Sequence, residues 1–278
     1  MAATRAAVLG APVAHSLSPA LHAAAYRALG LADWSYEAIE CDEARLPGLL
    51  ASLGPDWAGL SLTMPLKRAV LPLLDHTEPL ATTVAAANTV ILRDGQRLGF
   101  NTDVAGLVAA FRAAGVTPEG NVVVLGAGAT ACSALAALRE TGISDVTVAV
   151  RSRPRAEPLL TVAGQLGVPV RVVDLGAGLL ASRRWDVLIS TIPGTAAAGV
   201  AELFTAGAVT ARAVVDVGYD PWPTPLAVAA AAAGSVVISG YELLVHQAAG
   251  QVELMTGHRA PVEVMRAAGL AELDRRRE

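Results

Sequence analysis

Short clusters of polar side chains interrupt an otherwise apolar first half of the chain, and their residue types suggest anion binding and proton transfer. Ser16 and Ser18 lie two residues apart within residues 14–19, AHSLSP. Their hydroxyls serve either as turn and helix-cap groups or as donors to a ligand carboxylate. Because ligands collect at the carboxyl ends of strands in open α/β sheets, we expect three further clusters to follow strands and to meet at one cleft. These clusters are residues 61–67, SLTMPLK, residues 86–89, AANT, and residues 101–103, NTD.

Each cluster also has an ordinary structural interpretation. Lys67 is placed like a surface lysine at a helix start, Asn88 like a turn residue, and Asp103 like the N-cap of the helix that follows. Ser18, just before a proline, is likewise placed to cap a helix. A chemical role therefore depends on the whole set and not on any single member.

The second half opens on a pattern that is typical of dinucleotide binding. The apolar residues 122–125 lead into Gly-Ala-Gly and then into a predicted helix. The first glycine permits a tight turn, the second lets the backbone approach a pyrophosphate, and the helix N-terminus offers free N–H groups to the anion. We predict a dinucleotide site here, with an ordinary turn as the alternative. Its residues are Gly126, Ala127, Gly128, Ala129 and Thr130.

The residues after the next strand indicate which nucleotide is bound. NAD-binding domains usually place Asp or Glu there to bond the ribose 2′-hydroxyl, whereas Val150 is followed by RSRPR with no acid. Guanidinium groups bind phosphate bidentately, so the loop favours the 2′-phosphate of NADP(H). A solvated loop is the alternative. The predicted phosphate-binding residues are Arg151, Ser152 and Arg155.

Hydrophobic periodicity places these residues in two consecutive α/β domains. In the first half it predicts strands at 6–9, 34–40, 59–63, 89–92 and 98–101, with helices at 19–29, 44–53 and 104–114. In the second half it predicts strands at 122–125, 146–150, 187–191, 213–217 and 236–239, with helices at 130–141 and 157–166. Residues 117–120 resemble a domain junction, and the last helices, 243–256 and 262–271, are expected to fold back onto the first domain. We therefore predict a substrate-binding domain with a mainly parallel sheet, 1–103 joined by 243–278, and a Rossmann NADP-binding domain, 104–242.

Taken in order, these residues resemble the shikimate dehydrogenase family. The first part of the pattern is Gly10-x-Pro12-x-x-His15-Ser16-x-Ser18-Pro19-x-x-His22, Thr63-x-Pro65-x-Lys67, Asn88-Thr89 and Asn101-Thr102-Asp103-x-x-Gly106. The second part is Gly126-Ala127-Gly128, Asp216-x-x-Tyr219-x-Pro221-x-x-Thr224-x-Leu226, and Gly240 to Gln247-Ala248. The resemblance covers nearly the whole chain, and the ordered set is far more specific than any one motif.

The resemblance implies an oxidoreductase that reversibly reduces 3-dehydroshikimate to shikimate with NADPH, in the chorismate route to aromatic amino acids. It implies Lys67 and Asp103 as the catalytic pair. A cationic lysine at a ketone oxygen would stabilise the developing charge and deliver the proton. The implied substrate-binding residues are Ser16, Ser18, Thr63, Lys67, Asn88, Asp103, Tyr219 and Gln247, and Val217, Gly240 and Leu243 would frame the nicotinamide.

The chain departs from the family pattern at several positions. Ser61, Ala23 and Val150 stand where the family usually has asparagine, Ala129 where it has another glycine, and Leu243 where it has methionine. The catalytic pair is retained, and leucine is close to methionine in volume. The change at Val150 bears on the contacts to the adenine ribose.

Composition excludes several other functional classes. With 53% hydrophobic and 17% charged residues, the 278-residue chain can bury a substantial core, and a net charge of −4 provides no broad basic field for nucleic acid. The arginines at 275–277 stand beside acids and predict a solvated tail. The two cysteines and five histidines show no disulfide framework or metal-ligand spacing, and the apolar residues 226–238 are too short to cross a bilayer. We expect a soluble, cytoplasmic, metal-free enzyme with a small-molecule substrate, and the oligomeric state stays open.

Two alternatives remain. A quinate or shikimate dehydrogenase with relaxed choice of substrate or nucleotide, or a relative acting on an amino analogue of shikimate, would keep the fold, although the arginines after Val150 argue against NAD. A non-catalytic sensor of pathway metabolites would be free to lose its proton-transfer pair, whereas Lys67 and Asp103 are both present.

Overall fold

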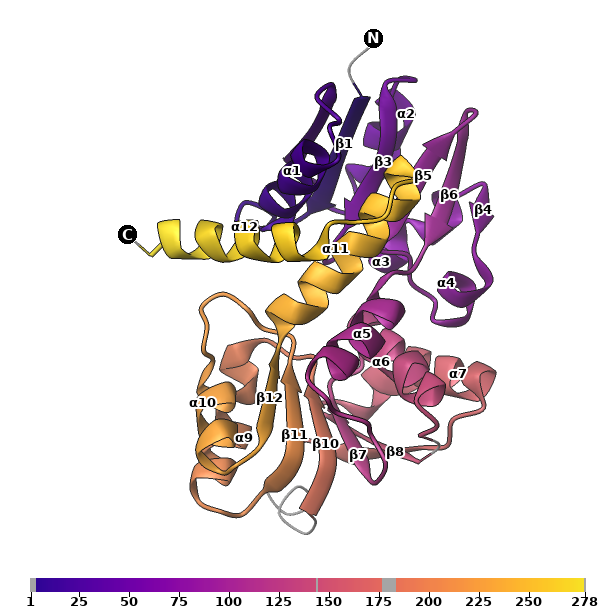
Figure 1. Cartoon of the computed structure of the whole chain (residues 1–278). Helices are drawn as coiled ribbons and strands as arrows, with labels where there is room; N and C mark the ends of the chain where they lie inside the picture. The colour runs from indigo at the N-terminus through magenta and orange to yellow at the C-terminus, as the bar shows by residue number, and fades with distance from the viewer. Residues whose placement is uncertain (1–3, 144, 177–183, 278) are drawn as a thin grey trace. The chain divides into compact units, whose positions relative to one another are not determined.

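The computed structural model describes residues 4–143, 145–176 and 184–277, which form two compact α/β units (Figure 1). The first unit comprises Met1–Thr102 and Val245–Glu278, and the second comprises Asp103–Leu244. The first unit is therefore discontinuous in sequence. Residues 117–120 lie inside the second unit and not at a junction, which corrects that expectation.

The first unit is built on a mixed six-stranded sheet. Its strands are β1 (Thr4–Gly10), β2 (Trp34–Glu40), β3 (Trp57–Leu62), β4 (His76–Thr77), β5 (Thr89–Arg93) and β6 (Gln96–Phe100), in the order β2-β1-β3-β5-β6-β4. β1 is parallel to β2 and β3, and β4 is parallel to β6, whereas β5 is antiparallel to both β3 and β6. The β5–β6 hairpin therefore turns a mainly parallel sheet into a mixed one.

Both faces of the first sheet are covered, because successive side chains of a strand point to opposite sides. Ala7, Leu60 and Val90 lie in one apolar cluster with α2 (Leu46–Ser52), α3 (Leu66–Ala69) and α4 (Pro79–Thr83). Ala6 and Ile91 lie in another cluster, with Leu254 and Met255 of α11 (Gly240–Thr256). Helix α12 (Val262–Arg275) packs on α1 (Ser18–Ala28), so the last helices return to the first unit as predicted.

The second unit has an all-parallel six-stranded sheet, which confirms the predicted Rossmann domain. Its strands are β7 (Val122–Leu125), β8 (Val146–Val150), β9 (Val170–Asp174), β10 (Arg184–Ser190), β11 (Thr210–Asp216) and β12 (Val236–Ser239), in the order β12-β11-β10-β7-β8-β9. Its helical segments are α5 (Asp103–Ala113), α6 (Ala129–Glu140), η2 (Arg153–Ala156), α7 (Glu157–Leu166), α9 (Gly194–Thr205) and α10 (Pro225–Ala232).

Strand β9 and helices α9 and α10 were not predicted. α10 consists largely of alanine, and both α9 and α10 contribute to one buried cluster with Leu125, Trp185 and Val214. Alanine favours helix but adds little polarity contrast, so a helix made largely of alanine has no clear apolar stripe. In residues 226–238 the sequence pattern therefore gave no signal for α10, although it predicted β12 at its observed bounds.

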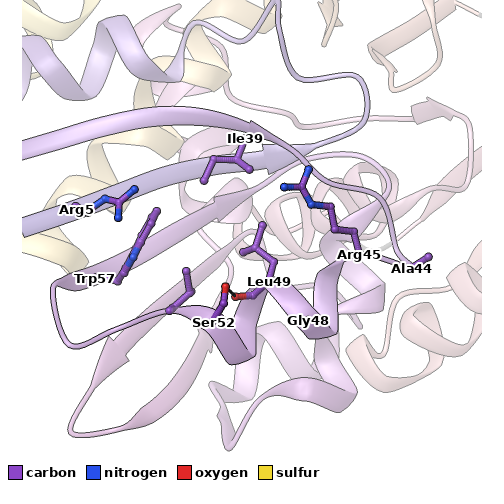
Figure 2. Close-up of a pocket in the computed structure, with 9 residues that line it drawn as sticks. Arg5, Ile39, Ala44, Arg45, Gly48, Leu49, Ser52 and Trp57 are labelled. Carbon is purple, nitrogen blue, oxygen red and sulfur yellow. Dashed lines mark hydrogen bonds between the residues drawn. The ribbon is translucent and has the colours of Figure 1, made fainter.

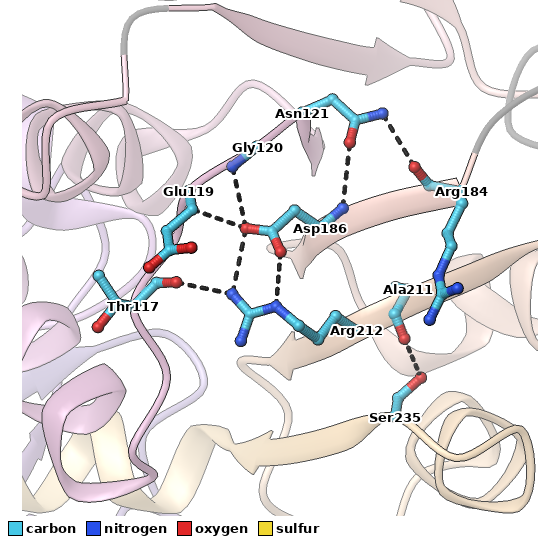
Figure 3. A network of polar contacts seen from close by, with 9 residues as sticks. All are labelled: Thr117, Glu119, Gly120, Asn121, Arg184, Asp186, Ala211, Arg212 and Ser235. Carbon is cyan, nitrogen blue, oxygen red and sulfur yellow. Dashed lines mark hydrogen bonds and ion pairs between the residues drawn. The ribbon is translucent and has the colours of Figure 1, made fainter.

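A polar network fastens the starts of β10 and β11 to the segment that enters β7 (Figure 3). Arg212 Nε donates to Asp186 Oδ1 at 2.6 Å, and Arg212 Nη2 donates to the Thr117 carbonyl at 2.6 Å. The backbone N–H groups of Glu119 and Gly120 donate to Asp186 Oδ2 at 2.8 and 3.2 Å. Burial alone raises the pKa of Asp186, but the bonds from Arg212 and these N–H groups bring it below its ordinary value. The network explains why residues 117–120 belong to the second unit.

None of the helices within the described ranges is both long and apolar enough to cross a membrane. Within the same ranges, no group of three or more His, Cys, Asp or Glu side chains is placed to hold a metal ion.

Candidate functional site

The polar clusters of the first unit lie at the edge of its sheet that is formed by the carboxyl ends of the parallel strands β1 and β3. The segments with Ser16 and Lys67 follow the ends of these two strands. Residues 86–88 precede β5 and Thr89 is its first residue, so the prediction that each cluster follows a strand was wrong here. Because β5 runs antiparallel, its start still reaches the same edge, where Thr89 pairs with Ser61 of β3 and with Phe100 of β6.

Ser16 and Ser18 are fixed by the start of α1. The Ser16 N–H donates to the Val13 carbonyl at 2.9 Å, and the Ser18 N–H donates to Ser16 Oγ at 3.2 Å. Ser16 thus satisfies a free N–H at the start of the helix, and the prediction that Ser18 caps it was wrong because Ser18 is itself the first helical residue. The Ser18 side chain is buried.

The end of α12 holds the Ser16 loop. Arg276 Nη1 donates to the His15 carbonyl at 2.6 Å, and Arg276 Nη2 donates to the Ser16 carbonyl at 3.1 Å. Glu272 of the same helix accepts from Arg276 Nε at 2.8 Å and so fixes the guanidinium. Arg276 is therefore a structural contact of this loop and not part of a solvated tail, which corrects the sequence expectation.

Lys67 lies in the short helix α3, directly after β3 and the Thr63 turn. The Thr63 N–H donates to the Leu9 carbonyl at 2.9 Å, and the Lys67 carbonyl accepts from the Ala87 N–H at 2.8 Å. Thr63 and Lys67 are both partly exposed. These backbone bonds tie the Lys67 segment to β1 and to the segment that carries Asn88.

Lys67 carries a compositional signal that sequence reasoning missed. It is the only lysine in the chain, and the other 20 cationic residues are arginines. Arginine stays protonated in proteins, whereas a lysine ammonium can give up a proton. A chain that otherwise uses arginine throughout thus keeps its single lysine at the position expected to transfer a proton.

Asn88 and Gln247 meet in the buried interior of the first unit. Asn88 Nδ2 donates to Gln247 Oε1 at 3.1 Å and to Thr102 Oγ1 at 2.9 Å. The Thr102 N–H donates in turn to Asn88 Oδ1 at 2.9 Å. The structure thus brings together two predicted substrate-binding residues that are 159 positions apart in sequence.

Neutral aromatic side chains lie close to these amides. The His22 ring stacks on Tyr36 with centroids 3.9 Å apart, and Tyr26 Oη lies 3.4 Å from His22 Nδ1. Burial lowers the pKa of His22 to about 3, with a smaller opposing contribution from Gln251, so this histidine is neutral near neutral pH. Burial also raises the pKa of both tyrosines. His22 therefore belongs to a neutral polar core.

The remaining predicted substrate residues lie in the second unit. Asp103 is buried in the first turn of α5, where a helix N-terminus favours a carboxylate. Tyr219 lies in the loop after β11, which is organised by the buried Asp216. Thr224 Oγ1 donates to Asp216 Oδ2 at 2.6 Å, and the Gly218 N–H donates to Asp216 Oδ1 at 3.2 Å. Burial raises the pKa of Asp216 despite these bonds.

The predicted dinucleotide loop lines a pocket of about 490 Å³ in the second unit. Gly126 has φ +102, and a Cβ there would lie 2.8 Å from both Ile192 Cγ2 and Thr191 Oγ1, so only glycine suits this turn. Gly128 is the N-cap of α6, whose first turn contains Ala129 and Thr130. The lining residues are Gly126, Ala127, Gly128, Ala149, Val150, Arg151, Ser152, Arg155, Leu175 and Ile192, and none of them is acidic.

The three arginines after β8 do not behave alike. Arg151 and Arg155 line the pocket, whereas Arg153 pairs with Asp174 at 3.1 Å and is not among the lining residues. At the other predicted nicotinamide positions, Val217 and Gly240 are in direct backbone contact, since a Cβ on Gly240 would collide with the Val217 carbonyl. Leu243 is buried in α11.

Another pocket of the first unit, of about 650 Å³, lies between α2 and the strands β1, β2 and β3 (Figure 2). Arg5 and Trp57, at the starts of β1 and β3, stack with the guanidinium carbon 4.3 Å from the ring centroid. Arg5 also pairs with Glu37 at 2.7 Å, and Arg45 Nη1 donates to a backbone carbonyl at 2.6 Å. Both guanidinium groups thus contact the protein, and no predicted site residue lines this pocket.

Comparisons with known proteins agree with this architecture. Three family models match the chain: a shikimate dehydrogenase substrate binding domain over residues 8–90, a shikimate/quinate 5-dehydrogenase over 109–217, and a shikimate 5′-dehydrogenase C-terminal domain over 240–268. The NADP(+)-dependent shikimate dehydrogenase of Symbiobacterium thermophilum is 36% identical over 276 residues, covering 96% of this chain and 94% of that protein.

Solved structures give the same result. Mycobacterium tuberculosis shikimate dehydrogenase has a TM-score of 0.86 and 43% identity, with coverage of 97% of this chain and 99% of that one. Thermus thermophilus shikimate 5-dehydrogenase, in complex with NADP(H) and shikimate, has a TM-score of 0.83 and 36% identity, with coverage of 96% and 99%. The chain therefore belongs to the shikimate dehydrogenase family.

Proposed function

We propose that the chain is an NADP-dependent shikimate dehydrogenase that reversibly reduces 3-dehydroshikimate to shikimate. The observation that carries this proposal is the sheet edge of the first unit, where the segments with Ser16, Lys67 and Asn88 assemble and Gln247 meets Asn88. The names of the relatives support the same activity, and the Thermus structure contains both ligands. By the same similarity we propose a cytoplasmic enzyme.

The second unit suits NADP(H). Gly126 and Gly128 would cradle the pyrophosphate beside the N-terminus of α6, and Arg151, Ser152 and Arg155 would bind the 2′-phosphate. The absence of acids among the lining residues favours a phosphate over a free 2′-hydroxyl. When bound, NADPH supplies the hydride. Val217, Gly240 and Leu243 are the proposed nicotinamide neighbours.

The first unit supplies the groups that would bind and protonate the substrate. Ser16 and Ser18 are proposed to donate to the substrate carboxylate, and Thr63, Asn88 and Gln247 to bond its remaining oxygens. Reduction of a ketone places negative charge on its oxygen. The Lys67 ammonium would stabilise that charge and donate a proton to the oxygen, with Asp103 orienting the lysine and bonding a ring hydroxyl. Tyr219 is proposed to lie near the ring.

The proposal is tested by following reduced-nicotinamide absorbance with shikimate and NADP in the parent, Lys67→Ala and Lys67→Arg. We expect Lys67→Ala to lower kcat by about 10²- to 10⁴-fold, with the KM for shikimate changed only a few-fold. Lys67→Arg keeps the charge but cannot release a proton at working pH, so it should also be severely impaired. Parental turnover in Lys67→Ala would remove Lys67 from the mechanism. Parallel assays with quinate and with NAD measure selectivity.

A further inference from the structure

We propose that Thr89 and Gln251 are positioning residues that hold the Asn88 amide in place and, through it, the Gln247 amide that faces the substrate. This inference rests on the proposed function, in which Gln247 binds a substrate oxygen. Neither Thr89 nor Gln251 is assigned to substrate or cofactor binding. All four side chains belong to the first unit, and each is less than one-tenth exposed.

Two backbone groups determine which way the amides point. The Thr102 backbone N–H can only donate, and it lies 2.9 Å from Asn88, so the atom it meets must be the amide oxygen, Oδ1. The Asn88 backbone carbonyl can only accept, and it lies 3.2 Å from Gln251, so the atom it meets must be the amide nitrogen, Nε2. The O and N positions of both amides are therefore fixed by groups that have no alternative role.

The Thr89 hydroxyl links these two amides in one direction. It lies 3.2 Å from Gln251 Nε2 and 2.8 Å from Asn88 Oδ1. Because Gln251 Nε2 can only donate and Asn88 Oδ1 can only accept, the Thr89 oxygen must accept from Gln251 and its proton must go to Asn88.

The hydrogen bonds on the other side of Gln251 also have fixed donors and acceptors. Ser61 Oγ lies 2.8 Å from Gln251 Oε1, which can only accept, so the Ser61 proton is committed there. Tyr36 Oη, 2.6 Å from Ser61 Oγ, must then donate to it. Ser61 is one of the positions at which this chain departs from the asparagine usual in the family, and its hydroxyl accepts from Tyr36 and donates to Gln251. The relay is this series of hydrogen bonds, which runs from Tyr36 through Ser61, Gln251 and Thr89 to Asn88.

The relay reaches Gln247 through Asn88. With Asn88 Oδ1 occupied by Thr89 and Thr102, Asn88 Nδ2 faces Gln247 Oε1 at 3.1 Å. The Gln247 amide oxygen is thereby used inside the protein, so we expect Nε2 to donate the bond from that amide to the substrate. Such an N–H donor suits the carbonyl and hydroxyl oxygens of a polyhydroxylated acid.

Burial makes the relay sensitive to a single lost hydroxyl. Thr89 is 0% exposed and Gln251 is 1% exposed, so water has no access to replace a missing partner. Removing the Thr89 hydroxyl would leave a Gln251 N–H short of an acceptor and Asn88 Oδ1 short of a donor. The amides would then be held only by their remaining hydrogen bonds and would be placed less precisely, which weakens substrate binding without affecting the nucleotide loop.

The test compares steady-state kinetics of the full-length parent with Thr89→Val, Thr89→Ser and a matched control, Thr147→Val, using shikimate and NADP. Thr147 is a buried strand threonine of the second unit whose hydroxyl accepts from Arg171 Nη2 at 3.3 Å. For Thr89→Val we expect the KM for shikimate to rise about tenfold, with the KM for NADP within about twofold of the parent. Thr89→Ser restores the hydroxyl and should restore the KM for shikimate, and Thr147→Val should leave it unchanged.

Three results would overturn the inference: a parental KM for shikimate in Thr89→Val, equal rises in both KM values, or no rescue by Thr89→Ser. If Thr89→Val does not fold, Gln251→Met provides the same comparison, with a parental KM for shikimate again counting against the inference. A parent that fails to turn over shikimate refutes the proposed function itself. Normal turnover in the parent together with an unaffected variant refutes only the positioning role.

Discussion

Replacing Arg151 should weaken the binding of NADP much more than the binding of NAD. Arg151 and Arg155 both line the pocket beside the Gly126 turn, and both are exposed. A charge-assisted hydrogen bond contributes about 1.5–3 kcal/mol, and exposure to solvent favours the lower end of that range. A loss of about 1.4 kcal/mol corresponds to a tenfold change in binding. We therefore expect Arg151→Ala to raise the KM for NADP about tenfold.

Arg153 provides a matched control two residues away. Its guanidinium pairs with the exposed Asp174, and it does not line the pocket. Arg153→Ala removes the same charge from the same loop, so it should change the KM for NADP by less than about twofold, as for an exposed ion pair.

The assay is initial-rate kinetics with shikimate, in which NADP or NAD is varied at low and at moderate ionic strength. For Arg151→Ala, the KM values for NAD and shikimate should stay near those of the parent. Because the contact is electrostatic, the difference between the variant and the parent should shrink as salt is added. Equal rises in the KM values for NADP and NAD, or equal effects of Arg151→Ala and Arg153→Ala, would refute the assignment.

Three further predictions concern the supports of the site. Arg276→Met should raise the KM for shikimate about threefold to tenfold, because it releases the Ser16 loop. Arg275 pairs with Glu272 but does not contact that loop, so Arg275→Met should leave this KM unchanged. Equal KM values for the two variants would show that Arg276 does not support the loop. His22 has a folded-state pKa of about 3, below its ordinary 6.5, so the unfolded chain binds an extra proton between these values and stability falls as pH is lowered through this window. Urea unfolding at pH 7.5 and 4.5 should show about 2–3 kcal/mol less acid destabilisation in His22→Phe than in the parent, and an equal loss would contradict the buried neutral state. Thr224→Val removes the helix-cap oxygen that accepts from the Ala227 N–H at 3.1 Å, and also the hydroxyl that donates to Asp216. It should lower the free energy of unfolding by about 1–3 kcal/mol, and an unchanged urea midpoint of unfolding would exclude this role.

The sequence predicted the strands and the polar clusters of the candidate site better than the contacts that hold those clusters in place. Alternating and continuous apolar runs identify most strands, and a glycine turn between a strand and a helix identifies the dinucleotide loop. The hairpin register that brings Asn88 to the end of β3 depends on strand pairing, which no local pattern encodes. The contacts of Arg276 with the Ser16 loop join residues about 260 positions apart, so the local charge pattern around Arg276 indicates only a solvated tail.

The orientations of the Asn88 and Gln247 amides also could not be predicted from the local sequence. Asn88 and Gln247 were predicted as substrate residues from the family pattern, but Thr89 and Gln251 look like ordinary strand and helix residues. Their importance arises from burial and from two backbone groups that meet only in the folded first unit. The difference between Arg153 and its neighbours likewise depends on Asp174, which lies on a strand that the sequence did not predict.

The discontinuity of the first unit has a consequence for biosynthesis. The sheet is complete by Phe100, but the face with Ala6 and Ile91 is covered by Leu254 and Met255, which a ribosome adds more than 150 residues later. The second unit is continuous, so it can finish folding during translation while that apolar face still waits for α11. During this interval the apolar face with Ala6 and Ile91 stays uncovered, and the proposed catalytic Lys67 can act only after α11 has been synthesised.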